Sequence, residues 1–329
     1  MTLKTNTPTP RRYVLLLAAA LGCVGLAPAF AAGYPERPVK IIVSLPPGSG
    51  ADTTARFLAQ HLTQTLGQPF VVENKPGANS FIAAKAVADA PADGYTLFVA
   101  SNSPMVTNAA VFRRLPYDPL KDFAPVASLA RFPMVIVVPA NSPYTTLGGL
   151  VAAMKAAPGK LNFASGTPTY QVAMEQFHER NGIKGTVVPY KGTGPAVSDL
   201  AAGICDYSIA EVSAVMPLIR GGKLRALAVA SAEHHKDLPE VPTAAESGNK
   251  GYEAYAWTGV FFPAKVPAAI VQRVGDQVRA VMSSAEGATF IGNLGGAVFT
   301  GSAQQLRDFQ LAEIEATKRV VKSANIPIE

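Results

Sequence analysis

The sequence predicts an α/β fold with mostly parallel sheets, because short runs rich in β-branched residues alternate with segments of helical periodicity. The strand-like runs are, in chain order, "VKIIVSL", "PFVVEN", "YTLFVAS", "MVIVVPA", "KLNFAS", "GTVVPY", "CDYSIA" and "LRALAVAS". No internal repeat or low-complexity linker separates them. The chain is long enough for two domains, each stabilised by its own core.

Residues 1–31 are predicted to be a cleaved secretory signal peptide. Arg11 and Arg12 precede the apolar run "YVLLLAAALGCVGLAPAF", and the small-residue sequence "AFA" follows as a cleavage site. The run contains glycine and proline and is short for a membrane span, which needs ~20 apolar residues. The arginine pair leaves the general secretory and twin-arginine routes both open. We therefore expect a periplasmic protein.

The first helix is predicted directly after the strand "VKIIVSL". Five apolar residues there have the i, i+3, i+4, i+7, i+11 spacing of one buried stripe. They are Ala55, Leu58, Ala59, Leu62 and Leu66. Asp52 is placed to cap the amino end of this helix.

Two later helices have equally clear signals. A similar apolar stripe runs from Leu147 to Met154, after the polar sequence "SPYTT". The last helix opens with Ser302 and Gln305, whose spacing is that of a capping box.

A long run in the middle of the chain predicts a crossing between two lobes. The stretch "LPYDPLKDFAPVASLARFPMVIVVPA" joins a proline-rich loop to an extended run interrupted by Pro133, so each half of the run is assigned to a different lobe. A return crossing is expected near "GGKLRALAVAS" or "AWTGVFFPA". We place the first segment of lobe 1 at residues 32–131, lobe 2 at 132–222, and a return segment that completes lobe 1 at 223–329, with C-terminal helices that straddle both lobes.

Composition and motif content exclude several functional classes. Without the leader the chain keeps 26 basic and 23 acidic residues, a formal charge of +3, and no basic run with interleaved aromatic residues marks a nucleic-acid reader. Cys205 is the only cysteine that remains, and we expect it to be a buried small hydrophobe. His61 and His178 lack the spacing of a metal site, as do His234 and His235, which lie in a predicted solvated loop. We expect no nucleic-acid partner, no metal and no cofactor.

The stretch "IIVSLPPGSGADTTARFLAQHL", residues 41–62, joins the first strand to the first helix through a glycine-rich turn. It lacks the third glycine of G-x-G-x-x-G, and the chain contains no G-x-x-x-x-G-K-[ST] or G-x-S-x-G sequence. A helix N-terminus offers unpaired N–H groups and partial positive charge, and glycines let a ligand approach the backbone. The turn therefore has the features of a small-anion socket, although a single turn of this kind is more often only a tight connection.

The same design recurs after three more strands. The turns are "PGANSFIAAKAVA" after "VVEN", "ASGTPTYQVAMEQF" after "LNF", and "KGTGPAVSDLAAG" after "VVPY". In an open α/β sheet such turns lie at the carboxyl ends of the strands, where ligands bind. Lys191 follows a strand and Glu211 ends one, so both are candidates to face a ligand; a surface lysine and a helix-capping carboxylate are the alternatives. The recurrence predicts a ligand-binding cleft.

Six segments of the chain resemble the substrate-binding receptors of tripartite tricarboxylate transporters, also called Bug-type periplasmic receptors. They are "YPERPVKIIVSLPPGSGADTTAR", "VVENKPGA", "PADGYTLFVAS", "LPYDPLKDFAPV", "VPYKGTGPAVSDLAAG" and "GGKLRALAVASA…LPEVPTAAESG…GYEAYAWTGVFFPA", and the similarity covers residues 34–329. The resemblance implies a two-lobed type II periplasmic binding-protein fold of the Venus-flytrap form. It further implies a mostly parallel sheet in each lobe, a hinge of crossing strands, one ligand in the interlobe cleft and no enzymatic reaction.

The family holds a ligand carboxylate largely through backbone N–H groups, hydroxyls and ordered waters from the strand-to-helix loops, without an obligatory arginine. In this chain the resemblance also implies a structural role for Asp52. Together with the polar turns described above, it predicts a set of ligand-binding residues: Pro47, Gly48, Ser49, Asn79, Ser80, Phe81, Ser101, Ser165, Gly166, Thr167, Lys191, Gly192, Thr193 and Glu211.

Departures from the family pattern leave the identity of the ligand open. The residues from Asn79 to Phe81 stand where further glycines and an asparagine are usual, the turn at Ser165 is shorter, and Ala210-Glu211 replaces a common Asp-Asn. Phe81 is expected to offer an aromatic face or to reduce the pocket volume, and Glu211 to repel a second carboxylate. We predict a monocarboxylate, zwitterionic or with an aromatic or apolar body, over a tricarboxylate such as citrate. The alternative is that both side chains point away from the cleft.

The implied partners are a small carboxylate and the permease subunits of a tripartite tricarboxylate transporter, with the receptor acting as a monomer. Two other functions remain as alternatives. One is a receptor that presents its closed form to a sensor-kinase ectodomain. The other is an exported hydrolase or isomerase that uses Lys191 or Glu211 as a base.

Overall fold

Strands and helices alternate through most of the chain in the computed structural model, which describes residues 1–2 and 33–328. The strands are β1 (Val39–Val43), β2 (Phe70–Asn74), β3 (Thr96–Ser101), β4 (Phe123–Pro139), β5 (Asn162–Ser165), β6 (Thr186–Pro189), β7 (Tyr207–Glu211), β8 (Leu224–Val229), β9 (Tyr255–Pro263) and β10 (Ala297–Gly301). The helices are α2 (Gly50–Leu66), α3 (Phe81–Ala88), α4 (Asn108–Val111), α5 (Leu147–Ala156), α6 (Pro168–Asn181), α7 (Thr193–Ala201), α8 (Val212–Arg220), α9 (Ala268–Ser283), α10 (Ala285–Asn293) and α11 (Ala303–Ser323), with the short helical turns η2 (Ala78–Ser80) and η3 (Ser103–Thr107). Every predicted strand is confirmed, and β10 is a strand that the sequence patterns missed. The predicted signal peptide lies almost wholly outside the described residues.

The strands of the described residues form one mixed sheet with the order β2-β1-β3-β9-β4-β7-β5-β6, and β8 and β10 also pair with β4. Pairing is parallel within β2-β1-β3 and within β7-β5-β6. The crossing strands β4 and β9 are antiparallel to all their neighbours. The parallel parts therefore lie at the two ends of the sheet, and the antiparallel part lies between them.

The fold has two lobes joined by the crossing strands. We call the part built on β1, β2, β3, β9 and β10 the first lobe and the part built on β5 to β8 the second lobe. The amino-terminal part of β4 pairs with β9 and β10, and its carboxyl-terminal part pairs with β7 and β8. Pro133 does not interrupt β4, because it lies opposite Tyr255, the first residue of β9, where pairing passes from one lobe to the other.

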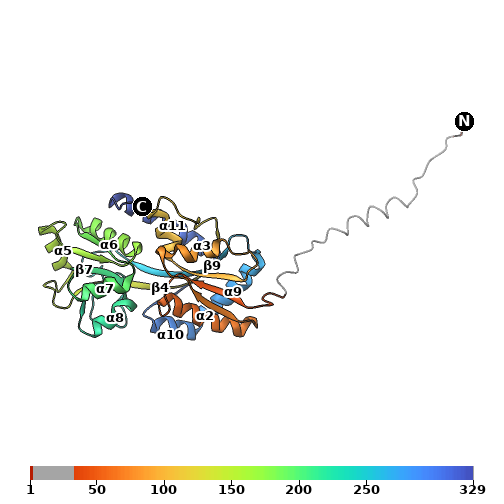
Figure 1. The fold of residues 1–329 in the computed structure, drawn as a ribbon, viewed down its shortest axis with the longest axis horizontal. Coiled ribbons are helices and arrows are strands. Elements are labelled where there is room, and N and C mark those ends of the chain that lie inside the picture. Colours follow the sequence, from red (N-terminus) through yellow and green to blue (C-terminus); the bar gives the residue numbers. More distant parts are fainter. Residues whose placement is uncertain (3–32, 329) are drawn as a thin grey trace. The chain divides into compact units, whose positions relative to one another are not determined.

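Helices cover the sheet in both lobes (Figure 1). Helices α5, α6, α7 and α8 lie around β7, whereas α2, α3, α9 and α10 lie around the other end of the sheet, and β4 runs between the two groups. Helix α11 contacts β4 and η3 and also contacts α6, so it touches both lobes. The exact lobe limits stay a prediction. Strand β8, which those limits assign to the return segment, pairs with the same part of β4 as β7 does, on the opposite edge, and so belongs to the second lobe.

The helix patterns read from the sequence are largely confirmed. Four of the five residues of the α2 stripe are buried, and the fifth, Leu66, is half-buried. Ser302 and Gln305 form the predicted capping box of α11. The predicted cap of α2 is wrong: Ser49 is the N-cap, and its Oγ accepts a hydrogen bond from the Asp52 N–H at 3.2 Å. Serine occupies the cap because its extended backbone directs the hydroxyl to the first turn.

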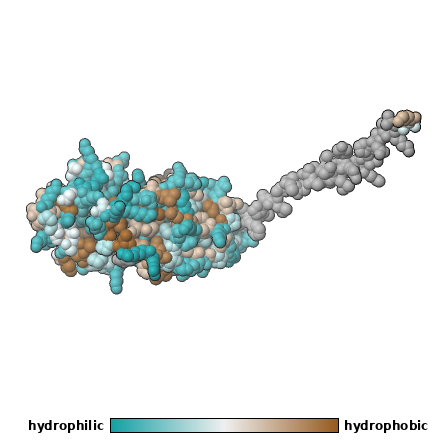
Figure 2. Space-filling view, turned by 90° about the horizontal axis from the view of Figure 1, so that it is seen from above, coloured by the Kyte–Doolittle hydropathy of each residue, from teal (hydrophilic) through white to brown (hydrophobic). Residues whose placement is uncertain are grey.

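Large aromatic residues form much of the core. Trp257, Phe98, Phe123 and Phe261 belong to a buried cluster in the first lobe, and Tyr207 is fully buried in the second. Figure 2 shows one face of the molecule, on which hydrophilic residues separate small hydrophobic patches. Among the described residues no helix is both long enough and apolar enough to cross a bilayer.

Two further sequence expectations can be compared with the structure. Cys205 is buried, as predicted, and burial raises the pKa of its thiol. The predicted solvated loop is only half correct: His234 is exposed, but His235 is buried. The His235 ring uses both nitrogens, since Nε2 donates to the Gly295 carbonyl at 2.8 Å and Nδ1 accepts from the Asp237 N–H at 3.2 Å.

Candidate functional site

A cleft of ≈ 940 Å³ is lined by residues of both lobes, and we call it the front cleft. Its size is at the upper end of the ~300–1,000 Å³ typical of small-molecule sites. Eight of the predicted ligand-binding residues line it: Gly48, Ser49, Ser101, Thr167, Lys191, Gly192, Thr193 and Glu211. The structure therefore brings together most of the turns that the sequence singled out.

Four helices begin at the front cleft. The first residues of α2, α7 and α8 line it, as does the N-cap residue of α6. Each of these helices follows a strand whose carboxyl end faces the cleft, because β1, β5, β6 and β7 all lead directly into them. Unpaired N–H groups and the positive end of the helix dipole thus converge from both lobes. This arrangement suits an anionic ligand.

In the turn between β1 and α2, the N–H groups that are free to bind a ligand lie just after the residues that the sequence predicted. The Gly48 N–H donates to Asp52 Oδ2 at 2.9 Å, and the Ser49 N–H donates to the Pro46 carbonyl at 3.2 Å. The N–H groups of the next two residues, Gly50 and Ala51, make no hydrogen bond within the described residues, and both residues line the cleft. They are the donors available to an anion.

Asp52 holds this turn in shape. It is almost fully buried, and its carboxylate also accepts from Arg56 Nε at 3.0 Å and from Asn74 Nδ2 at 2.9 Å. Burial alone would raise the pKa of Asp52, but the hydrogen bonds from Arg56, Gly48 and Asn74 together lower it. An ionised Asp52 therefore connects the turn to α2 and β2, which is the structural role that the resemblance implied.

The turn between β5 and α6 is fixed by its own residues. Buried Ser165 donates to the Thr167 carbonyl at 3.0 Å. Thr167 caps α6 by accepting from the Tyr170 N–H at 3.3 Å, so its hydroxyl hydrogen stays available for a ligand. A Cβ on Gly166 would lie 2.7 Å from Thr193 Cα. Glycine is required there because this turn touches the turn that begins α7.

Glu211 lies at the second-lobe side of the cleft, where it has two protein partners. Its Oε1 accepts from the Tyr170 hydroxyl at 3.2 Å, and it also interacts with the Ser213 side chain. It occupies the N-cap position of α8 but makes no capping hydrogen bond. Burial raises the pKa of Glu211, and the two hydrogen bonds offset this only in part. The sequence left two alternatives for Glu211, a carboxylate that faces the cleft and one that caps the next helix, and the structure favours the first.

Other charged side chains complete the lining. Lys191 is exposed at the cleft, and Arg220 lies on the same lining with its Nη2 3.7 Å from Asp237 Oδ1. Thr258 of β9 is buried, and its hydroxyl has no partner among the described residues. With Glu211 included, the cleft carries two cationic and two acidic side chains.

Six of the predicted residues do not line the front cleft. Ser165 and Gly166 support the turn beneath it, and Pro47 is exposed beside it. The other three belong to the turn between β2 and α3. Asn79 accepts from Asn108 Nδ2 through its carbonyl at 2.8 Å, and the Phe81 ring packs against Phe112 with centroids 5.0 Å apart.

Strand order explains why the turn after β2 lies away from the cleft. β2 is the outermost strand of the first lobe, whereas β1 and β3 lie nearer the crossing strands. The turns after β1 and β3 therefore reach the cleft, as Ser49 and Ser101 illustrate. The sequence patterns of the two kinds of turn are alike, so only the strand order distinguishes them.

Several cleft residues escaped the sequence reasoning. Arg220 ends α8 and Asp237 follows β8, and nothing in their local sequence marks them as cleft residues. The start of α8, from Val212 to Ala214, repeats the strand-to-helix pattern and was a signal available in the sequence. Within the described residues no three His, Cys, Asp or Glu side chains gather in the manner of a metal site.

Comparison with known proteins identifies the family. The family described as "TctC: Tripartite tricarboxylate transporter family receptor" matches residues 54–326. Protein BugT of Bordetella pertussis (strain Tohama I) is 34% identical over 322 residues, which are 97% of this chain and 99% of that protein.

Two solved structures with bound carboxylates are similar to this chain. "R. palustris Rpa4515 with adipate" has a TM-score of 0.83 and 34% identity, and the match covers 89% of this chain and 99% of that one. "MatC (Rpa3494) from Rhodopseudomonas palustris with bound malate" has a TM-score of 0.78 and 31% identity, covering 88% and 100%. With its two lobes, crossing strands and front cleft, this chain belongs to the tripartite tricarboxylate transporter receptor family of Bug-type periplasmic binding proteins.

Proposed function

We propose that this protein binds one small organic acid in the front cleft and delivers it to the membrane subunits of a tripartite tricarboxylate transporter. The observation that carries the proposal is the convergence of four helix N-termini on one cleft, with the amides of Gly50 and Ala51 unpaired. Backbone donors held by helices need no ordering when a ligand arrives, so they bind a carboxylate without a dedicated arginine.

The two solved relatives support a carboxylate as the ligand, since one contains adipate and the other malate. In the proposed pose the ligand carboxylate lies between the start of α2 and the turns at Thr167 and Thr193. Closure of the two lobes excludes water and strengthens each of these hydrogen bonds.

The far end of the ligand is proposed to face Glu211. An ionised Glu211 repels a second carboxylate and attracts an ammonium or a hydroxyl. We therefore propose a monocarboxylate, zwitterionic or with an apolar body, over a tricarboxylate. The support for this choice comes from Glu211 alone, because the Phe81 ring packs against Phe112 and Tyr117.

A thermal-shift screen tests ligand class and cleft together. The panel contains adipate, malate, citrate, a zwitterionic amino acid and an aromatic monocarboxylate, with simple amines and sugars as the comparison set. A true ligand at a hundredfold excess over its dissociation constant stabilises the native state by ~2.7 kcal/mol. The proposal is wrong if amines or sugars stabilise the protein and no carboxylate does.

Glu211→Gln then tests the role of Glu211, with exposed Glu240→Gln as the matched control outside the cleft. Burial raises the pKa of Glu211, so lowering the pH neutralises it before an ordinary glutamate. We expect dicarboxylate affinity to rise in the wild type as the pH falls, and Glu211→Gln to have that higher affinity already at neutral pH. Tight citrate binding that neither the substitution nor pH alters would refute the choice of a monocarboxylate.

Delivery to a permease, rather than turnover, is the other part of the proposal. NMR of a bound carboxylate over hours should reveal no product, and uptake of the labelled ligand by cells should require both the receptor and the permease subunits. Chemical conversion of the ligand would instead restore the enzyme alternative.

A further inference from the structure

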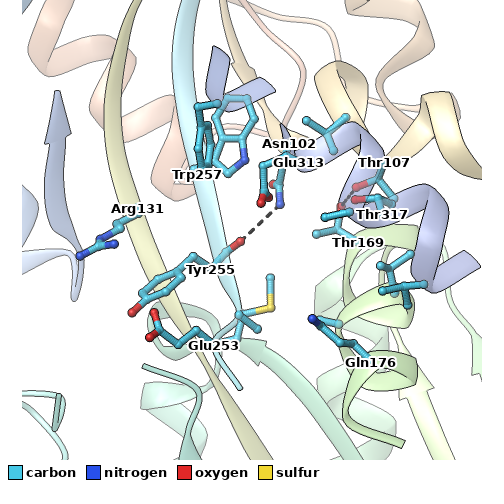
Figure 3. A pocket seen from close by; sticks show the side chains of 18 of the residues that line it. Asn102, Thr107, Arg131, Thr169, Gln176, Glu253, Tyr255, Trp257, Glu313 and Thr317 are labelled. Carbon is cyan, nitrogen blue, oxygen red and sulfur yellow. Dashed lines mark hydrogen bonds between the residues drawn. The ribbon is translucent and has the colours of Figure 1, made fainter. Parts of the chain in front are cut away.

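A second cavity of ≈ 220 Å³ lies on the other face of β9 (Figure 3). We call it the back cavity. Successive residues of β9 separate it from the front cleft: Tyr255 lines only the back cavity, Ala256 and Thr258 only the front cleft, and Trp257 both. This is the alternation expected of a strand between two spaces. The back cavity is therefore distinct from the proposed carboxylate site.

Residues of both lobes enclose the back cavity. Thr107 of η3 comes from the first lobe and Thr169 of α6 from the second, and their hydroxyls are 2.9 Å apart. Helix α11 forms another wall through Glu313 and Thr317, and β4 contributes Arg131. The cavity is thus built by packed helices and crossing strands.

Glu313 is a carboxylate of this cavity that has no protein partner among the described residues. It is half-buried on α11, and its carboxylate makes no hydrogen bond or ion pair within the described residues. Figure 3 draws it beside Asn102 and the indole of Trp257. Trp257 Nε1 is likewise buried and has no acceptor among the described residues. This end of the cavity therefore contains both an acceptor and a donor that the protein leaves unpaired.

The other charges around the cavity do not neutralise Glu313. Arg131 is exposed at the rim, where its guanidinium lies 4.8 Å from the Tyr255 ring centroid and 5.9 Å from that of Phe299. Glu253 lines the cavity near Tyr255 and adds a second negative charge. The groups that line the cavity thus have a net charge of −1 when both carboxylates are ionised.

We propose that the back cavity binds a small organic ammonium ion, with Glu313 as its counterion and the rings of Trp257 and Phe309 as its apolar wall. An ammonium beside an aromatic ring and a carboxylate is stabilised by ring electrons as well as by charge. The two rings lie edge to face with centroids 5.4 Å apart, and both line the cavity. The volume is below that of drug-sized sites, so the ligand has few heavy atoms.

Choline and its neutral isostere 3,3-dimethylbutan-1-ol test this site, because they have nearly the same shape and differ in charge. Binding is followed by titration of the ¹⁵N-labelled protein, with shifts expected at amides of α11 and β9. We expect choline to bind at least about tenfold more tightly than the alcohol. Glu313→Gln should remove this preference, whereas Glu315→Gln should keep it, since Glu315 is exposed on the same helix and pairs with Lys318 at 3.0 Å.

Two further measurements distinguish the cavity from the front cleft and from a structural role of Glu313. Burial raises the pKa of Glu313. As the pH drops through this raised pKa, Glu313 loses its charge, so choline affinity should fall in the wild type but not in Glu313→Gln. Gly166→Ala, which disturbs the front cleft, should bind choline with wild-type affinity while it binds carboxylates more weakly. Equal binding of choline and the alcohol, an unchanged choline affinity in Glu313→Gln, or the absence of saturable choline binding would each overturn the proposal.

Discussion

Gly166→Ala should damage both the stability and the ligand affinity of the protein through one steric contact. The new Cβ would lie 2.7 Å from Thr193 Cα, 2.9 Å from Thr193 N and 3.0 Å from the Gly192 carbonyl carbon. All three are backbone atoms, which cannot rotate away as a side chain can. The two turns must therefore separate by several tenths of an ångström, and overpacking of this kind costs about 1–3 kcal/mol.

The displacement falls on Gly192 and Thr193, which line the front cleft at the start of α7. Loss of one hydrogen bond from this turn to the ligand would weaken binding by about 0.5–1.5 kcal/mol, or roughly 2–13-fold in the dissociation constant. Urea unfolding measures the first effect, and calorimetry with the best carboxylate of the screen measures the second.

Gly148→Ala is the matched control. Gly148 is exposed on α5, and a Cβ there meets no atom within 4 Å. Alanine in a helix should raise stability by about 0.5–1 kcal/mol and leave affinity unchanged. If Gly166→Ala has wild-type stability and affinity, the contact between the two turns does not shape the cleft.

Two other substitutions test the cleft and its support. Thr258→Val removes a buried unpaired hydroxyl, so it should raise the stability of the ligand-free protein by up to about 1 kcal/mol and weaken carboxylate binding by about 0.5–1.5 kcal/mol. Thr300→Val, at another buried unpaired hydroxyl outside the cleft, should change stability only. Calorimetry that shows equal affinity in both variants would contradict this role of Thr258. Asp52→Asn should destabilise the protein by about 1–3 kcal/mol near neutral pH. The pKa of Asp52 is lowered in the folded state, so its stabilising effect is present above the unfolded pKa and is lost as the pH falls through the folded pKa. In urea unfolding, the difference in the free energy of unfolding between wild type and Asp52→Asn should therefore shrink from neutral to acidic pH. A difference that stays constant would contradict the ionic network.

Local signals in the sequence predicted the elements well, because they depend on neighbouring residues. The capping box at Ser302 and Gln305 and the apolar stripe of α2 are properties of a single helix. The error at Asp52 is also local: serine three residues earlier competes for the cap, and Asp52 instead bonds back to the Gly48 N–H. β10 was missed because its five residues are only partly buried and carry a weak strand pattern.

The sequence could predict only those residues of the candidate site that lie where a strand leads into a helix. Thr167 and Thr193 could be found because each follows a strand and begins a helix. Phe81 has the same local context but follows the edge strand β2, and strand order is a long-range property. Arg220 and Thr258 reach the cleft through the packing of α8 and β9, for which the sequence offers no local sign.

The internal hydrogen bonds of the cleft explain how a receptor can recognise an anion with few charged side chains. Asp52 and Ser165 take up the polar groups that would otherwise let their turns move, and the contact at Gly166 locks the turns of the second lobe together. Among the described residues, the amides of Gly50 and Ala51 make no hydrogen bond and line the cleft. Little free energy is then lost in ordering the protein when the ligand binds, so most of the free energy of each hydrogen bond contributes to affinity. The guanidinium of Arg220 also lines the cleft, 3.7 Å from Asp237 Oδ1. A long side chain of this kind must lose conformational freedom to hold a ligand, and the fixed helix ends avoid that loss.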